Sequence, residues 1–212
     1  MSDAGLLALL QWLSPTFPVG SYAYSQGLEW EISAGRITDG PLLYAWLSDS
    51  LQQGAARMDA TLLAIALQLD SDLSRLAEYG EALASSRERH AETMEQGRAF
   101  GATVAALTGQ AIAPMPYPVA VGAAARQLGL ARRQVVALYL QTTVSSLIQV
   151  AVRFVPLGQT DGQRVLAALL PQIEATALAV EHARIEALGS AGLRADLASL
   201  RHETMEVRIF RT

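Results

Sequence analysis

Apolar residues recur at helical spacing along most of the chain. Leu43, Leu47 and Leu51 fall on one face of a helix, and Asp39 is placed to cap the start of that helix. The alternation of period two that marks a half-buried strand is not found convincingly in any segment. We therefore predict an all-α fold, a single-domain bundle of about nine or ten helices that takes up residues 1–212.

Glycine and proline divide the helical pattern into separate elements. The clearest loop is Gly109–Pro118, which has three prolines in five residues and is expected to link two helical layers. Pro171 is expected either to kink a helix or to start another that runs to about Ala187. The other helices are predicted at Leu6–Leu13, Gln26–Ala34, Asp59–Leu69, Ser71–Leu83 and Arg87–Leu107.

The segment Gln134–Val152 has no charged residue over 19 positions, so its apolar length would allow it to cross a membrane. It also carries serine, threonine and glutamine side chains throughout, and so many polar groups would be costly in lipid without partners. A helix that is apolar nearly all round is also typical of the centre of a bundle. We favour the central helix and keep the membrane span as the weaker alternative.

Composition excludes several classes of function. The net charge of −4 and the pI of about 5.4 leave no basic surface for nucleic acid and no cationic face for a membrane. The chain has no cysteine, and all 16 basic residues are arginine. Thiol nucleophiles, thiolate metal sites, Schiff-base lysines and phosphate-binding lysines are therefore excluded. We predict no catalytic residue, no cofactor and no metal site.

The N-terminal residues have an early acidic residue and no basic region, so they do not resemble a secretory signal. With no cysteine for a disulfide, we expect the protein to be cytoplasmic.

Two histidine–glutamate pairs provide the alternative to a non-catalytic protein. His182 and Glu186, and likewise His202 and Glu206, are four residues apart and could face one metal ion from a helix. A metal-dependent α-helical enzyme is the resulting alternative, although such pairs also occur as surface pairs that stabilise a helix. A further stripe of carboxylates is interpreted as a solvated face with ion pairs; its members are Glu81, Glu88, Glu92 and Glu95.

One short stretch differs from the apolar helices around it. Residues Ser14–Trp30 read SPTFPVGSYAYSQGLEW. Pro15 and Pro18 favour an extended backbone, and Gly20 permits a tight turn. Ser21 or Ser25 can then cap the helix that follows.

A rigid segment can hold aromatic side chains in fixed directions. Tyrosine and tryptophan on such a support suit a contact surface, because each combines a large apolar area with a polar end. The alternative is that the aromatic side chains plug the end of the bundle. The residues concerned are Phe17, Tyr22, Tyr24 and Trp30.

The same stretch, followed by AGRITD, closely resembles the N-terminal signature of the urease accessory UreF family. The charged helix at Arg87–Phe100, the run VRFVPLGQTDGQRVL at Val152–Leu166 and the ending RHETMEVRIFRT also resemble that family, in the family's order. The resemblance spans nearly the whole chain. Its N-terminal signature and its ending are specific, whereas the apolar helices between them are not.

The resemblance implies an all-α, homodimeric, non-catalytic scaffold and chaperone for nickel insertion. In that family the protein bridges UreD, called UreH in some species, and the GTPase UreG to apo-urease. Carried over by position, the signature and a tail at about 201–212 meet UreD. The residues expected there are Phe17, Tyr22, Tyr24, Arg208 and Phe210, and the surface for the GTPase stays unassigned. Ile209 and Thr212 stand where leucine and serine are common, which are mild departures.

Overall fold

The computed structural model describes residues 3–212 and confirms the all-α fold. Over these residues the chain forms ten α-helices and three short 3-10 helices, and no strand. The α-helices are α1 (Asp3–Trp12), α2 (Leu28–Ser33), α3 (Gly40–Gln53), α4 (Ala55–Ala66), α5 (Leu73–Ala82), α6 (Arg87–Thr108), α7 (Tyr117–Ala125), α8 (Arg132–Phe154), α9 (Gln159–Val180) and α10 (Leu193–His202). The 3-10 helices are η1 (Ser21–Ala23), η2 (Arg126–Leu128) and η3 (Ile185–Ala187).

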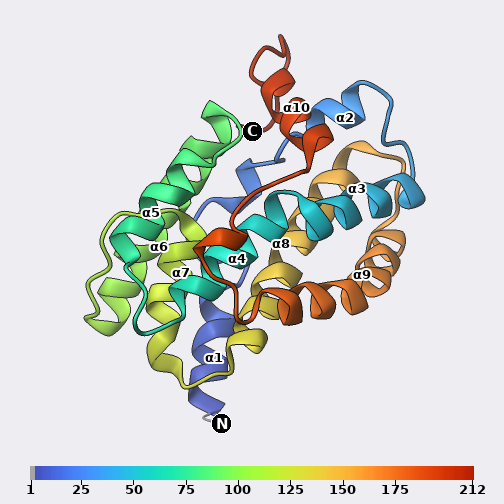
Figure 1. The fold of residues 1–212 in the computed structure, drawn as a ribbon. Helices are drawn as coiled ribbons and strands as arrows, with labels where there is room; N and C mark the ends of the chain where they lie inside the picture. The colour runs from blue at the N-terminus through green and yellow to red at the C-terminus, as the bar shows by residue number, and fades with distance from the viewer. Residues whose placement is uncertain (1–2) are drawn as a thin grey trace.

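Helices α4 and α8 form the centre of the molecule (Figure 1). α4 is buried from Met58 to Ala66, as its nearly continuous apolar sequence requires. On one side α5 and α7 pack against α4 and α6 packs on α7, and on the other α3 pairs with α9. α2 and α10 pack against each other at one end of the molecule, and α1 lies at the opposite end. This arrangement places α10 and the tail after it beside the signature segment.

The long uncharged segment is the helix α8. By length and composition α8 could cross a membrane, but half of its most apolar window is buried inside the protein. It packs against α2, α4 and α9, which together cover its apolar positions. Its polar residues Thr142, Ser145 and Gln149 are partly exposed on the side that these helices leave open. The burial agrees with the central helix predicted from the sequence.

Predicted helix ends are confirmed where a capping residue marks them. The Asp39 side chain accepts a hydrogen bond from the Leu42 backbone N–H at 2.9 Å, at the start of α3. α6 ends at Gly109, which adopts the left-handed conformation with φ of 75°. The loop predicted after Gly109 is present and extends to Pro116.

Several predicted helix bounds are wrong. The helix expected to begin at Asp59 begins at Ala55, because Asp59 is a buried mid-helix residue paired with Arg89 and does not mark a helix start. No new helix begins at Pro171, since α9 runs through it, and α9 ends at Val180, before the end predicted near Ala187. Pro171 has no backbone N–H, so the carbonyl of Ala167 lacks its usual helical hydrogen bond. Both residues lie on the exposed side of α9, where water can donate to that carbonyl instead.

Aromatic rings connect the signature segment to the core. The ring of Phe100 in α6 is fully buried, and the rings of Trp12, Phe17 and Tyr117 have their centroids 5.7–6.0 Å from its own. Such edge and tilted contacts add to the apolar area that the rings bury. The signature segment is therefore attached to the core through the buried ring of Phe17.

Candidate partner-binding surface

The signature segment is held in shape by two glycines. Gly20 has φ of 71° and Gly27 has φ of 80°, in the left-handed region that other residues seldom adopt. Gly27 has a second constraint, because a Cβ there would lie 2.7 Å from the backbone nitrogen of Ser199 in α10. The sequence pattern had indicated a role only for Gly20. Gly27 allows α10 to approach the backbone of the signature directly.

Replacing Gly27 with alanine is expected to destabilise the protein more than replacing Gly20. Both changes strain a left-handed residue, at a cost of about 1–2 kcal/mol. Only Gly27→Ala also forces α10 away, which adds about 1–3 kcal/mol, since nothing lies within 4 Å of a Cβ at Gly20. Urea denaturation of both variants measures the difference. Equal losses would mean that the close approach of α10 contributes nothing.

The C-terminal tail, residues 203–212, is ordered against the signature segment. The Arg211 backbone N–H donates to the Ala23 carbonyl at 2.8 Å, and the Ser25 N–H donates to the main-chain oxygen of Thr212 at 2.9 Å. The Ser25 hydroxyl also donates to that oxygen and accepts from the Glu29 N–H at 3.3 Å. Ser25 is thus the one of the two predicted capping serines that contacts the start of α2, and it fixes the tail as well.

Glu29 in α2 holds the tail and α10 together. Its carboxylate accepts from the backbone N–H groups of Ile209 at 2.8 Å and Phe210 at 3.0 Å. One of its oxygens also lies 2.8 Å from Nε2 of His202. A buried carboxylate with three donors is well compensated, and these donors come only from α10 and the tail.

His202 extends this network to α6. Its ring is fully buried, and Nδ1 lies 2.8 Å from the carboxylate of Glu88. The other oxygen of Glu88 accepts from the Arg208 guanidinium at 2.5 Å. A histidine ring satisfies two carboxylates only when both nitrogens carry a hydrogen. The chain Glu29–His202–Glu88–Arg208 therefore ties α2, α10, α6 and the tail into one unit, called the glutamate–histidine network below.

A second polar cluster lies beneath the signature. The buried Arg89 of α6 pairs with Asp59 at 2.6 Å and with Glu92 at 3.2 Å. Glu92 also accepts from the Gln26 amide at 2.9 Å and from the Thr212 hydroxyl at 3.4 Å. Burial raises the pKa of the Glu92 carboxyl, although Arg89 opposes this by favouring the charged form. The cluster joins the signature, the charged helix and the tail, the three segments on which the resemblance rests.

An ion-pair bridge reinforces the packing of α10 on α2. Arg36 and Arg194 donate to the two oxygens of Glu31, at 2.8 Å and 2.5 Å. Burial alone would raise the pKa of Glu31, but the hydrogen bonds from the two arginines outweigh it and lower the pKa. Because Arg194 belongs to α10, the bridge helps to fix that helix on the signature side of the molecule.

Two of the five predicted partner-binding residues are exposed. Tyr22 is 71% exposed on η1, and the Arg208 side chain is 41% exposed in the tail. Both have a free surface from which they can contact another protein. Their contact with a partner stays a prediction, but they have the accessibility that it needs.

The other three predicted residues are buried. Phe17 packs on Phe100, and Phe210 packs on Phe154 with ring centroids 5.4 Å apart. The Tyr24 hydroxyl donates to Glu95 at 2.8 Å, and burial together with this bond raises the pKa of Tyr24. In this conformation the three side chains support the surface from beneath. The direct contact predicted for them would require the tail or the signature to move.

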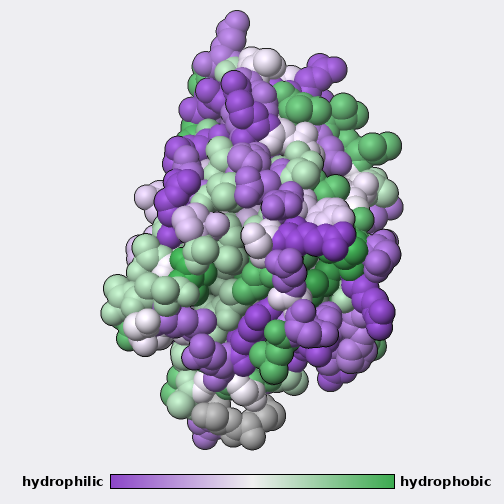
Figure 2. Space-filling view, turned by 60° about the vertical axis from the view of Figure 1, so that its left-hand side comes forward, coloured by the Kyte–Doolittle hydropathy of each residue, from purple (hydrophilic) through white to green (hydrophobic). Residues whose placement is uncertain are grey.

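α10 exposes an apolar stripe beside the tail. Its buried side consists of small and polar residues, whereas Leu193, Leu197 and Leu200 lie on the outer side at i, i+4 and i+7. Val207 and Ile209 in the tail are exposed as well. Figure 2 shows that the surface of one face of the molecule has hydrophobic patches among its hydrophilic areas. Contiguous exposed apolar area of this sort is typical of protein interaction sites.

The predicted metal pairs do not form. His182 lies in a turn after α9 and Glu186 in η3, so they share no α-helix. α10 ends at His202, and Glu206 follows in the tail while the His202 ring contacts Glu29 and Glu88. Among residues 3–212 no group of histidines and carboxylates is arranged to hold a metal ion.

The interpretation of the carboxylate stripe as a solvated face is also wrong in part. The side chains of Glu81 and Glu95 are 41% and 40% exposed, so these two are in contact with solvent as expected. Glu92 is buried and the Glu88 side chain is only 10% exposed, because α10 and the tail cover that side of α6. Sequence reasoning therefore missed the residues that attach the tail. The sequence did contain one indication of their role, because both carboxylates lie within Arg87–Phe100, the charged helix that resembles the UreF family.

A sequence model of the UreF family matches residues 37–170. The urease accessory protein UreF of Cereibacter sphaeroides (strain KD131 / KCTC 12085) is 56% identical over 210 residues, which cover 99% of this chain and 100% of that protein. The chain belongs to the UreF family. The UreF of Jannaschia sp. (strain CCS1) is 50% identical over 98% of this chain and 94% of its own length. That of Methylorubrum populi (strain ATCC BAA-705 / NCIMB 13946 / BJ001) is 46% identical, over 100% of both chains.

These comparisons cover more than the segments that first indicated the UreF family. The matched range 37–170 includes neither the signature at Ser14–Trp30 nor the tail, but the full-length relatives extend over both. Membership of the UreF family therefore rests on the central helices and on nearly the whole chain.

Proposed function

We propose that the chain is a scaffold and chaperone for nickel insertion into urease, which bridges UreD (or UreH) and the GTPase UreG to apo-urease. Membership of the UreF family, whose curated relatives are named urease accessory proteins, supports the general role. The proposal adds the specific partners. It also holds that the protein has no catalytic activity of its own, acts as a homodimer and works in the cytoplasm.

One observation carries the proposal: the signature, the charged helix α6 and the tail form a single surface unit. Glu29 and Glu92 attach the tail to the signature from below, and Tyr22 and Arg208 are exposed above them. The apolar stripe of α10 continues this surface. Large exposed aromatic and arginine side chains beside apolar area are the residues that most often dominate binding energy at protein interfaces.

The alternative of a metal-dependent enzyme has no comparable support. It relied on His182/Glu186 and His202/Glu206, and neither pair lies on one helix. Both ring nitrogens of His202 are already engaged by carboxylates within the chain.

The proposal is tested by complex formation among purified proteins. The chain is mixed with UreD and with UreG from the same organism and passed over a sizing column. We expect the chain to elute with UreD as a complex. When GTP and nickel are present, we expect UreG to join this complex. Elution of all three proteins separately at micromolar concentration would contradict the bridging role.

A further inference from the structure

A small surface hollow lies beside Tyr22, between the signature segment and the C-terminal half of α8. Its volume is about 150 Å³. Its polar lining consists of Ser21, Tyr22, Ser145, Ser146, Gln149 and Arg153. No aspartate or glutamate lines the hollow, although the chain as a whole has a net charge of −4.

The side chains in this lining have unused hydrogen-bonding capacity. Within residues 3–212, none of the six donates or accepts a side-chain hydrogen bond, and Arg153 forms no ion pair. Thr143, on the same helix, shows the usual alternative, because its hydroxyl donates to the Tyr139 carbonyl at 3.0 Å. The hydroxyl groups, the amide and the guanidinium of the hollow are instead free to donate to a ligand.

A group of free donors with one unpaired guanidinium and no carboxylate is complementary to an anionic oxygen group. Arginine presents several donors in a planar fork that fits a carboxylate with two hydrogen bonds. The hydroxyl groups of Ser145, Ser146 and Tyr22 can donate to the same oxygens. The volume suits one acidic side chain and is too small for a large ligand.

The surroundings indicate that the anion is presented by a protein. The next residue after Arg153 is Phe154, which lines a mainly apolar groove of about 520 Å³ at the same end of α8 together with Trp30 and Ile209; Glu29 and Glu206 also lie in its lining. The hollow and the groove therefore both reach the C-terminal end of α8, and Tyr22 lines the hollow. An apolar area with an adjoining charged subsite is the usual composition of a protein interface.

We infer that the hollow beside Tyr22 receives an aspartate or glutamate side chain of the protein that docks on this face, with Arg153 as the residue that selects it. The inference rests on the proposed function, because it assumes that the UreD-type partner binds beside Tyr22. It adds Arg153, which belongs to neither the signature nor the tail, to the partner-binding surface. It also requires that the partner present an acidic side chain there.

Two variants remove the anion site in different ways. Arg153→Gln removes the charge but keeps a polar side chain of similar length. Gln149→Glu places a carboxylate one helical turn before Arg153, where it pairs with the guanidinium and fills the hollow from within the chain. A pair at this spacing favours the helix, and circular dichroism on the variant verifies that it is folded. We expect each variant to bind UreD about tenfold more weakly than the unmodified chain.

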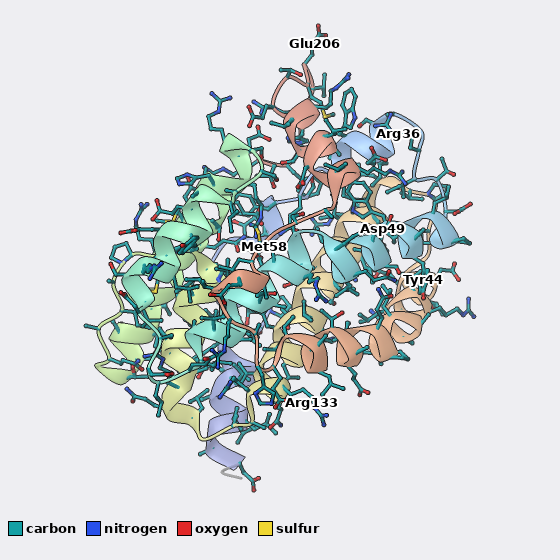
Figure 3. All side chains as sticks on the ribbon, in the orientation of Figure 1. Arg36, Tyr44, Asp49, Met58, Arg133 and Glu206 are labelled. Atoms are coloured by element: carbon teal, nitrogen blue, oxygen red, sulfur yellow. The ribbon has the colours of Figure 1, made fainter. Side chains whose placement is uncertain are left out.

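Arg133→Gln is the matched control. Arg133 is exposed near the start of the same helix and forms no ion pair within residues 3–212. The rise of an α-helix places it about 30 Å from Arg153, and Figure 3 shows it far from Glu206 in the tail. Its removal changes the net charge by the same amount, so any general electrostatic effect on binding appears in both arginine variants.

The affinities for UreD are measured by titration at two salt concentrations. A tenfold loss in Arg153→Gln and Gln149→Glu, with Arg133→Gln unchanged, would support the inference. Equal affinities in all four proteins would overturn the inference while leaving the proposed function intact, and failure of the unmodified chain to bind UreD would overturn both. A rise in melting temperature with millimolar acetate or phosphate that Arg153→Gln abolishes, together with unchanged UreD binding, would assign the hollow to a free anion and also overturn the inference.

Discussion

Replacing His202 with alanine is expected to lower the free energy of unfolding by about 3–5 kcal/mol. The change removes the ring that lies between the carboxylates of the buried Glu29 and the largely buried Glu88, so both lose a partner while having little access to water. It also leaves a cavity where a fully buried side chain had been. For a chain of this size the loss corresponds to a fall in melting temperature on the order of 10 °C.

The tail should be released by the same substitution. His202→Ala weakens the network that holds residues 203–212, so trypsin is expected to cleave after Arg208 and Arg211 faster than in the unmodified chain. His182→Ala is the control, because that histidine is exposed in a turn and has no side-chain bond within residues 3–212. If the melting temperature of His202→Ala stays within about 2 °C of that of the unmodified chain, the network contributes less than about 1 kcal/mol to stability.

Replacing Tyr22 or Arg208 with alanine is expected to abolish the complex with UreD while leaving the fold intact. Both side chains are exposed, so little burial is lost when they are shortened. Glu88, the ion-pair partner of Arg208, keeps its contact with His202. Truncating a central aromatic or arginine residue of an interface typically costs about 2 kcal/mol or more, which is about thirtyfold in affinity.

Exposed residues of the same types elsewhere serve as controls for these two variants. Tyr44 in α3 is partly exposed beside Asp161 and Arg164 of α9, and Arg133 is exposed near the start of α8 (Figure 3). Tyr44→Ala and Arg133→Ala should elute with UreD as the unmodified chain does. Complexes that form equally well with Tyr22→Ala and Arg208→Ala would remove these residues from the interface. Circular dichroism on each variant verifies that the helices are retained.

The fold could be predicted from the sequence where local chemistry decides it. Asp39 and Gly109 mark helix ends because capping and the left-handed conformation depend on neighbouring backbone groups. Pro171 was harder to interpret, since its effect depends on whether the carbonyl it frees can reach water. Asp59 was misread because its partner, Arg89, is 30 residues away.

The candidate site could be predicted only in outline. Helical spacing shows that Glu88 and Glu92 lie near one another on α6, but it cannot show that the chain's last ten residues cover them. The same limit applies to Phe17, Tyr24 and Phe210, because an aromatic residue on a rigid segment can face outward or inward. Gly27 and Glu29 were missed since their roles appear only when α10 and the tail are in place.

The measurement that tests the scaffold role most directly is urease activation in cells. A complete urease operon from one organism is expressed without its own UreF gene, and either this chain or its Tyr22→Ala/Arg208→Ala double variant is supplied. We predict that the unmodified chain restores urease activity and nickel bound to urease, and that the double variant restores neither. Urease that is equally active and equally loaded with nickel whether or not the chain is present would contradict the account.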